Sequence, residues 1–269
     1  HNGARVNFAA GYGDLRAANV AGTEELLRLL ADSDSPGMHY VSTTSVHAPS
    51  AGPVTVTETT PTGPAGDLPD GYAQSKWVAE GLIGLARERG LPVTVHRPGR
   101  ISGDTATGAC QDRDLLWQLI KGCLQAKAVP DLPHGSTGWV PVDYVSAAVV
   151  ALASAGRGGT ETFHLTHPDA PDLERVFATA GTLGYELRRV PAEEWRALVA
   201  ARPDNAAQLF LGEGGNAGGA VDGRRFDSRR TAAAAAELGV RPPALTEEVL
   251  VRYLAYFRGT GFLPAPDVL

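Results

Sequence analysis

Apolar side chains recur along this chain with two different spacings. Near-helical spacing runs through Asp14–Ala31 and Gly71–Arg89, and Gly90 follows the second segment as a C-terminal stop. Short apolar runs typical of buried strands stand at Gly37–Val46, Leu91–Arg97 and Thr162–Leu165. Because strands and helices alternate, the pattern predicts an α/β fold built on a doubly wound parallel sheet of Rossmann type, whose N-terminal part we expect to be missing.

The pattern changes beyond Pro168, where apolar positions recur mainly at helical spacing. We therefore assign residues 1–167 to the sheet-bearing domain, with an excursion near 104–136 into a second lobe, and residues 168–269 to that smaller, mainly helical lobe. Further helices are predicted at Asp114–Cys123, Tyr144–Ala155, Asp172–Ala180, Ala192–Ala201, Arg230–Leu238 and Glu247–Phe257. The Pro/Gly/Thr-rich segment Ala48–Pro69 is predicted as a long loop over a binding site, and the Gly-rich segment Glu213–Gly223 as mobile.

Composition and charge narrow the class of protein. The 269 residues carry a formal net charge of −6 and no basic block, which argues against a nucleic-acid partner. Two cysteines are too few for a disulfide framework, the histidines lack metal-ligand spacing, and no apolar run is long enough to cross a bilayer. We expect a cytoplasmic protein with no metal and no membrane partner. The only methionine is Met38, and His1–Phe8 resembles the end of a strand, so we also expect the chain to be a piece of a longer polypeptide.

Tyr72 and Lys76 are the first candidates for chemistry. They stand four residues apart on a predicted helix, so their side chains project from one face. A phenol with a pKa near ~10 is a poor proton donor or acceptor at neutral pH, and a neighbouring ammonium is expected to lower that pKa. The spacing alone is also typical of a solvated helix face, so it needs support from its surroundings.

The predicted sheet supplies that support. The hydroxyl cluster Ser42–Ser45 ends one strand, and the turn Arg97–Gly99 ends the next. Because the carboxyl ends of parallel strands line the ligand crevice, both should converge on the site of Tyr72. Three weak signals then indicate a single site.

These segments resemble extended short-chain dehydrogenases/reductases, and more closely the thioester reductase domains of nonribosomal peptide synthetases and related carboxylic acid reductases. The resemblance covers essentially the whole chain. The Tyr/Lys motif and Asn-Val-x-Gly-Thr mark the superfamily, whereas the opening and closing motifs point to the reductase group. The motifs are His1–Asn7, Asn19–Thr23, His39–Thr43, Gly71–Lys76, Arg97–Gly103, Val140–Val145 and Tyr256–Phe257 with Gly261–Pro264.

The resemblance implies a catalytic set and a set of cofactor contacts. Thr43 would hydrogen-bond the substrate oxygen, Tyr72 would donate a proton to it, and Lys76 would tune Tyr72 and hold the nicotinamide ribose. The implied cofactor-binding residues are Gly3, Ala4, Asn19, Ser42, Tyr72, Lys76, Pro98, Gly99 and Ile101. Simpler alternatives stay open: Asn19 as a helix cap or backbone partner, Gly3 and Ala4 as a strand exit, and Pro98 and Gly99 as a turn.

The implied function is NADPH-dependent reduction of a thioester on the phosphopantetheine arm of an upstream carrier protein, giving an aldehyde and, after a second hydride, an alcohol. The rivals are a sugar-nucleotide epimerase or dehydrogenase, a redox-independent thioester cyclase and a degenerate carrier-docking module. A thioesterase is disfavoured because no Gly-x-Ser-x-Gly elbow occurs. The family's glycine-rich phosphate loop after the first strand is expected upstream of His1, so we expect a monomeric domain of a synthetase that is inactive as this piece alone.

Overall fold

The chain forms two units, and each is built from three separate stretches of the sequence. The computed structural model describes residues 1–131, 136–156, 159–211 and 223–267. Residues 1–99, 144–168 and 223–242 form the first unit, whereas 100–143, 169–222 and 243–269 form the second. Each unit has its own cluster of buried apolar side chains.

A three-stranded parallel sheet organises the first unit. Its strands are β1 (Met38–Val41), β3 (Val93–Pro98) and β7 (Thr162–Leu165), in the order β1-β3-β7. The register pairs Tyr40 with Val95 and His96 with Phe163. All six residues of β3 are buried, as expected for a central strand covered on both faces.

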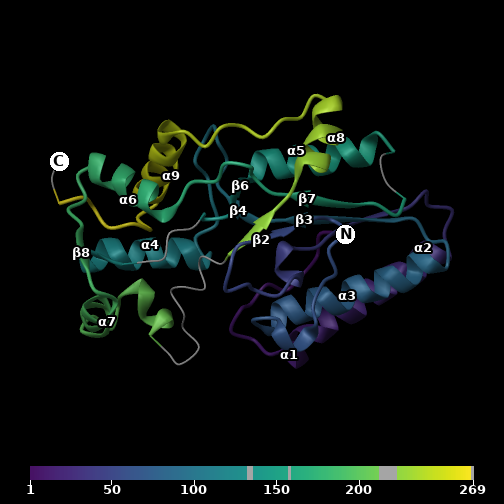
Figure 1. Cartoon of the computed structure of the whole chain (residues 1–269), viewed down its shortest axis with the longest axis horizontal. Coiled ribbons are helices and arrows are strands. Elements are labelled where there is room, and N and C mark those ends of the chain that lie inside the picture. The colour runs from purple at the N-terminus through teal and green to yellow at the C-terminus, as the bar shows by residue number, and fades with distance from the viewer. Residues whose placement is uncertain (132–135, 157–158, 212–222, 268–269) are drawn as a thin grey trace. The chain divides into compact units, whose positions relative to one another are not determined.

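Helices lie on both faces of this sheet. In Figure 1, α2 and α3 lie on one side of β3, and α5 and α8 lie on the other. The α/β class with a doubly wound sheet is therefore confirmed. The helical elements are α1 (Tyr12–Arg16), a π-helical turn (Ala17–Ala21), α2 (Gly22–Ala31), α3 (Gly71–Glu88), α5 (Val142–Ser154) and α8 (Arg229–Glu237).

Helix α3 carries the predicted chemistry, and local sequence sets both its ends. The side chain of Asp70 accepts a hydrogen bond from the backbone N of Ala73 at 2.8 Å, which caps the N-terminus. Gly90 has φ +88°, a left-handed conformation that ends helices without the steric cost of a Cβ. The predicted stop is confirmed. Ile83 and Ala79 are buried against the sheet and hold the helix on it.

The predicted loop Ala48–Pro69 contains a strand that sequence analysis missed. β2 (Val54–Val56) pairs in parallel with β9 (Arg224–Phe226), about 170 positions further along the chain. Residues 223–242, which we assigned to the C-terminal lobe, belong to the first unit because β9 pairs with β2 and α8 contacts β7. A three-residue strand whose partner is so distant leaves no local pattern to detect.

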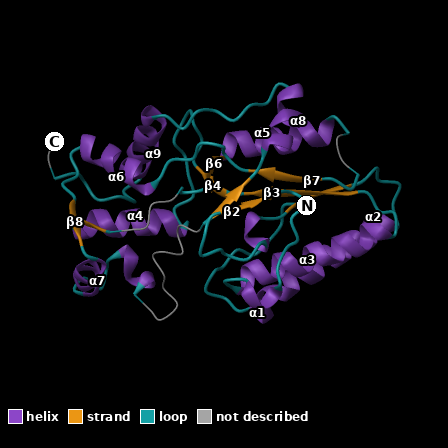
Figure 2. Ribbon diagram, viewed as in Figure 1, coloured by secondary structure: helices purple, strands orange, loops and turns teal. Residues whose placement is uncertain are grey.

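The second unit is mainly helical (Figure 2), and its core contains stacked aromatic rings among aliphatic side chains. The ring of Trp117 stacks on Trp139 at 5.0 Å and lies 4.5 Å from the ring of Phe257. Two parallel strand pairs, β4–β6 and β5–β8, complete the unit. Its elements are β4 (Arg100–Ser102), α4 (Leu115–Ala126), β5 (Ala128–Pro130), β6 (Trp139–Pro141), α6 (Leu173–Thr182), β8 (Arg188–Val190), α7 (Ala192–Ala200), a 3-10 helix (Ala206–Phe210) and α9 (Glu247–Gly259).

The N-terminal segment, predicted as the end of a strand, differs from that prediction. His1 alone pairs with β1: its amino group donates to His39 O at 2.6 Å, and Val41 N donates to His1 O at 3.0 Å. Residues 2–8 are exposed and form no strand. Of the Gly-rich segment predicted to be mobile, 213–222 lies outside the described residues. Within the part of the chain that the structure describes, no helix combines the length and apolar character needed to cross a bilayer.

Candidate active site

Helix α3 places Lys76 against the carboxyl end of β1. The lysine is 2% exposed, its Nζ donates a hydrogen bond to Val41 O at 2.7 Å, and the same atom lies 4.1 Å from the centroid of the Tyr40 ring. A main-chain oxygen and an aromatic face both stabilise an ammonium in a poorly solvated place. Lys76 is therefore fixed in position by the sheet itself.

Thr43 lies two residues beyond β1, in the turn that leaves the sheet. Its backbone is extended, and its Oγ1 accepts a hydrogen bond from Ser45 N at 3.2 Å. A hydroxyl that accepts one bond can still donate its proton. The Thr43 side chain also hydrogen-bonds that of Tyr72, and this bond lowers the pKa of Tyr72. The structure thus brings Thr43, Tyr72 and Lys76 together at one end of β1.

Burial shifts the pKa values of Lys76 and Tyr72, which both lie on α3. It lowers the pKa of Lys76 to about 8, against the opposing negative charge of Glu80. Burial raises the pKa of Tyr72 to about 12; the Asp70 carboxylate adds to the rise, and the bond to Thr43 opposes it. We expected the neighbouring ammonium to lower the pKa of Tyr72 towards neutral pH, but that pKa is raised, with burial as the largest cause. At neutral pH Tyr72 is a protonated hydroxyl, the form that can donate.

Asn19 ties the N-terminal segment to the base of α3. Its Oδ1 accepts from Arg5 N at 2.7 Å, and its Nδ2 donates to Arg5 O at 3.0 Å and to Ser75 Oγ at 2.9 Å. Ser75 Oγ in turn donates to Tyr72 O at 2.8 Å. Asn19 lies inside the π-helical turn, so it is a backbone partner rather than a helix cap. Both of its N–H donors are used within the protein.

The remaining residues predicted to contact the cofactor differ in burial and in the element to which they belong. Ser42 is buried, and its hydroxyl donates to a carboxylate oxygen of Glu80. Pro98 ends β3, and Gly99 N donates to Leu165 O at 3.0 Å. Two others, Gly3 and Ala4, are exposed. Ile101 is 39% exposed and belongs to the second unit, so its role as a cofactor contact stays a prediction.

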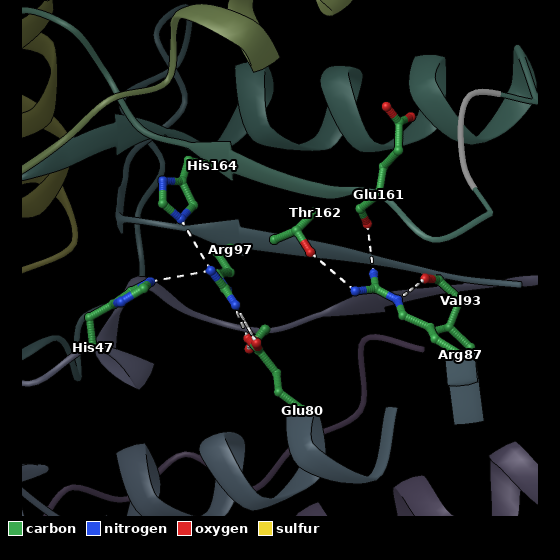
Figure 3. A network of polar contacts seen from close by, with 9 residues as sticks. His47, Glu80, Arg87, Val93, Arg97, Glu161, Thr162 and His164 are labelled. Carbon is green, nitrogen blue, oxygen red and sulfur yellow. Dashed lines mark hydrogen bonds and ion pairs between the residues drawn. The ribbon is translucent and has the colours of Figure 1, made fainter. Parts of the chain in front are cut away.

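A buried polar cluster around Arg97 went unrecognised in the sequence (Figure 3). Arg97 donates to both carboxylate oxygens of Glu80, through Nη2 at 2.6 Å to Oε2 and through Nε at 3.0 Å to Oε1. Its Nη1 lies 3.2 Å from His47 Nε2 and 3.4 Å from His164 Nε2. The available signal was spacing, since Glu80 continues the four-residue series of Tyr72 and Lys76 on α3.

The segment after Asn7 packs directly on the start of α3. The ring of Phe8 meets that of Tyr72 edge-on, with centroids 5.4 Å apart. A Cβ added to Gly71 would lie 2.4 Å from backbone atoms of Gly11 and Tyr12. Only glycine allows the two backbones to approach this closely, so Gly71 helps to fix the position of Phe8 over Tyr72.

The donors at this site fit the sugar hydroxyls of a nicotinamide cofactor. Among the described residues Lys76 makes one hydrogen bond, which leaves two N–H donors, and the Tyr72 hydroxyl lies one helical turn away. A cation and a phenol one turn apart suit a diol. No group of three or more His, Cys, Asp or Glu side chains that could hold a metal occurs within residues 1–131, 136–156, 159–211 and 223–267.

Comparison with known proteins agrees with this geometry. A model of the NAD-binding family described as male sterility protein matches residues 1–149. The chain is 36% identical over 276 residues to a linear gramicidin synthase polypeptide of Brevibacillus parabrevis, covering 98% of this chain and 5% of that protein. It is 37% identical over 292 residues to isonitrile lipopeptide synthase of Streptomyces coeruleorubidus, covering 99% of this chain and 19% of that protein.

A solved structure extends the likeness to the whole fold. The terminal R domain from the myxalamid PKS-NRPS biosynthetic pathway matches with a TM-score of 0.89 and 36% identity, over 99% of this chain and 69% of that domain. The chain thus spans a small part of the two synthetases but more than two thirds of the R domain. The predicted resemblance is confirmed, and the chain belongs to the terminal reductase (R) domains of nonribosomal peptide synthetases, within the NAD-binding male sterility family.

Proposed function

We propose that this chain is part of an NADPH-dependent reductase that releases a carrier-bound acyl or peptidyl thioester as an aldehyde, with the alcohol as the product of a second round. One observation carries the proposal. Thr43, Tyr72 and Lys76 gather at the carboxyl end of β1 in a chain that is 36% identical to a terminal R domain.

Thr43, Tyr72 and Lys76 have different roles at the thioester carbonyl. Lys76 and Tyr72 would hold the ribose of a nicotinamide cofactor, which would supply a hydride for the carbonyl carbon. Thr43 donates a hydrogen bond to the carbonyl oxygen, and Tyr72, protonated at neutral pH, donates a second bond or its proton as negative charge develops there. Lys76 stabilises the phenolate that remains. When the oxygen returns its proton to Tyr72, the carbon–sulfur bond breaks, and the thiolate takes a proton from water, giving aldehyde and thiol.

The partner and setting follow from the same proposal. The thioester would be carried on the phosphopantetheine arm of an upstream carrier protein, in a multidomain synthetase of which this chain is a monomeric part. The relatives named as synthetases support this arrangement. The helical lobe and residues 111–133 would bind the acyl group; of these, 132 and 133 lie outside the described residues. Two free thiols, Cys110 and Cys123, are in keeping with a cytoplasmic location.

The test is an assay of NADPH oxidation with an acyl-phosphopantetheine thioester. It uses the longest polypeptide that contains this chain, since the chain spans 69% of the R domain it matches. We expect loss of NADPH absorbance, with one aldehyde and one thiol formed per NADPH in the first round. A cyclised product with no NADPH consumed would identify a redox-independent cyclase instead. Turnover of a sugar nucleotide, with no reaction of the thioester, would identify an epimerase or dehydrogenase.

A further inference from the structure

Glu80 lies beside the proposed site but is not among its expected catalytic residues. It follows Lys76 by four positions on α3, so the two side chains share a helix face. Only 9% of its side chain and 8% of that of Arg97 are exposed. Figure 3 shows the carboxylate of Glu80 facing the guanidinium of Arg97, which comes from β3. A pair of charges this deeply buried is expensive unless each partner is well bonded.

Both carboxylate oxygens of Glu80 accept hydrogen bonds, and one of the donors is the hydroxyl of Ser42, next to Thr43. Oε2 accepts from Arg97 Nη2 at 2.6 Å, whereas Oε1 accepts from Arg97 Nε and from the hydroxyl of Ser42. Ser42 directly precedes Thr43, whose hydroxyl is proposed to bind the carbonyl oxygen. Glu80 therefore holds the end of β1 at the residue next to this hydroxyl.

The orientation of Glu80 is in turn fixed from the far side of Arg97. Nη1 of the arginine faces His47 and His164 at 3.2 and 3.4 Å. Burial and the charge of Arg97 lower the pKa of both histidines to about 4, so they are neutral at neutral pH and offer ring nitrogens as acceptors. The guanidinium is thus held on two sides, and its remaining edge points at Glu80.

The charge of Glu80 also acts on Lys76. Burial lowers the pKa of Lys76, and Glu80 opposes that effect. Other groups face Lys76: the ring of Tyr40, and the α-amino group of His1, whose pKa is lowered in part by Lys76. Glu80 itself is faced by Arg97 and, at longer range, by Arg87 and His47. Among these groups Glu80 is the negative charge on the same helix face as Lys76.

Resting on the proposed function, we propose that Glu80, oriented by Arg97, is a positioning residue of the reductase site: it holds the turn at Ser42 and Thr43 through a hydrogen bond and stabilises the ammonium of Lys76 through its charge. A purely structural ion pair between α3 and β3 would do neither. The two roles are separable by experiment, because one depends on a hydrogen bond and the other on a charge.

Arg87 offers a matched control on the same helix. It is half-buried and donates to Val93 O and Glu161 O at 2.7 Å and to Thr162 Oγ1 at 3.3 Å (Figure 3). Like Glu80 it joins α3 to β3, but it lies three helical turns beyond Lys76 and makes no bond to β1. Arg87→Gln therefore loosens the same interface without touching Ser42 or Lys76.

The first measurement does not require catalysis. The chain contains three lysines, Lys76, Lys121 and Lys127, so an NMR spectrum labelled at lysine Cε shows three signals, assigned with Lys121→Arg and Lys127→Arg. We expect Glu80→Gln to lower the pKa of Lys76 by about one unit, whereas Arg87→Gln leaves it within a few tenths. An unchanged pKa of Lys76 in Glu80→Gln overturns the charge role, whether or not the chain reduces thioesters.

The second measurement is steady-state reduction by the same variants. We expect Glu80→Gln to lower kcat roughly 10- to 100-fold with little change in KM, and to move the alkaline limb of the pH profile to lower pH. Glu80→Asp keeps the charge, so its limb should stay in place while kcat falls. Ser42→Ala, which removes only the hydroxyl contact, should lower kcat without moving the limb, and it tests the hydrogen bond if Glu80→Gln does not fold.

If Ser42→Ala is fully active, or if Glu80→Gln and Arg87→Gln have the same pH profile, the positioning role is overturned. An inactive parent protein overturns the proposed function instead.

Discussion

The two units of this chain bury different kinds of side chain. Around its parallel sheet the first unit buries Lys76, Arg97, His96 and His164, together with several hydroxyls and an amide. The second unit buries stacked aromatic rings around Trp117. Burying a polar or charged group costs free energy unless every partner is in place, whereas burying an aromatic ring is itself stabilising. The comparison indicates that the stability of the first unit depends on its buried hydrogen bonds, whereas that of the second depends on the packing of its rings.

The largest expected effect is on catalysis in the first unit. Tyr72→Phe removes one hydroxyl from a half-buried ring, so the fold should be unchanged, but the proton donor is lost. We expect kcat for thioester reduction to fall about 10²- to 10⁴-fold. The measurement is NADPH oxidation under saturating thioester, with thermal unfolding of the variant as the control. Full activity in Tyr72→Phe would show that the proton comes from another group.

The second unit should respond in the opposite way. Trp117 is 1% exposed and contacts the rings of Trp139, Tyr253 and Phe257. Trp117→Ala removes these contacts and leaves a cavity, so the free energy of unfolding should drop by about 3–5 kcal/mol. Urea unfolding checks this value, and segment-resolved hydrogen exchange should show the loss in α4 and α9. A drop below about 1 kcal/mol, well under the usual cost of such a cavity, would mean that this aromatic cluster does not hold the unit together.

Two buried asparagines sharpen the comparison at a smaller scale. Asn19 bonds Arg5 and Ser75 in the first unit, whereas Asn205 donates to Gly122 O at 3.0 Å and accepts from Ala207 N at 2.8 Å in the second. Each Asn→Ala variant leaves buried polar groups unpaired, so each should lose about 1–3 kcal/mol of stability. Only Asn19→Ala should also lower kcat, because only Asn19 supports the turn of α3 that carries Tyr72. Equal activity losses at matched stability would remove this distinction.

Local sequence was enough to predict those parts of the molecule whose causes are local. Helix α3, with Gly90 as its stop, could be predicted because its apolar spacing and its stop signal both lie within a few residues of their effect. The same holds for Tyr72 and Lys76, which share a face through the helical period alone. Strand β1 could be predicted from its apolar run, and its end places Thr43.

Features that depend on distant partners could not be predicted. The pairing of β2 with β9 joins residues about 170 positions apart, and the three-residue strands have no pattern of their own. The bonds of Arg97 to Glu80, His47 and His164 need the relative orientation of a helix, a turn and two strands. The raised pKa of Tyr72 depends on its burial, which no motif records.

The last expected effect concerns acid stability, and it again separates the units. Burial lowers the pKa of His47, His96 and His164 to about 4, and all three lie in the first unit. In the unfolded chain these rings titrate near ~6.5. Above that pH they are neutral in both states; as the pH falls from about 6.5 toward about 4, the unfolded state binds more protons and the first unit loses stability.

Single substitutions of the buried histidines test whether these rings cause the loss of stability in acid. Each ring contributes at most about 1.4 kcal/mol per pH unit to the slope, so His96→Gln should flatten the fall of unfolding free energy between about pH 6.5 and about pH 4 by up to that amount. Hydrogen exchange at about pH 7 and about pH 5, on either side of the ordinary histidine pKa, locates the loss: protection in β3 and β7 should drop more than protection in α4 and α9. The aromatic core of the second unit contains no histidine among its described residues, so equal losses in both units would place the acid sensitivity in the surface carboxylates rather than in the buried rings.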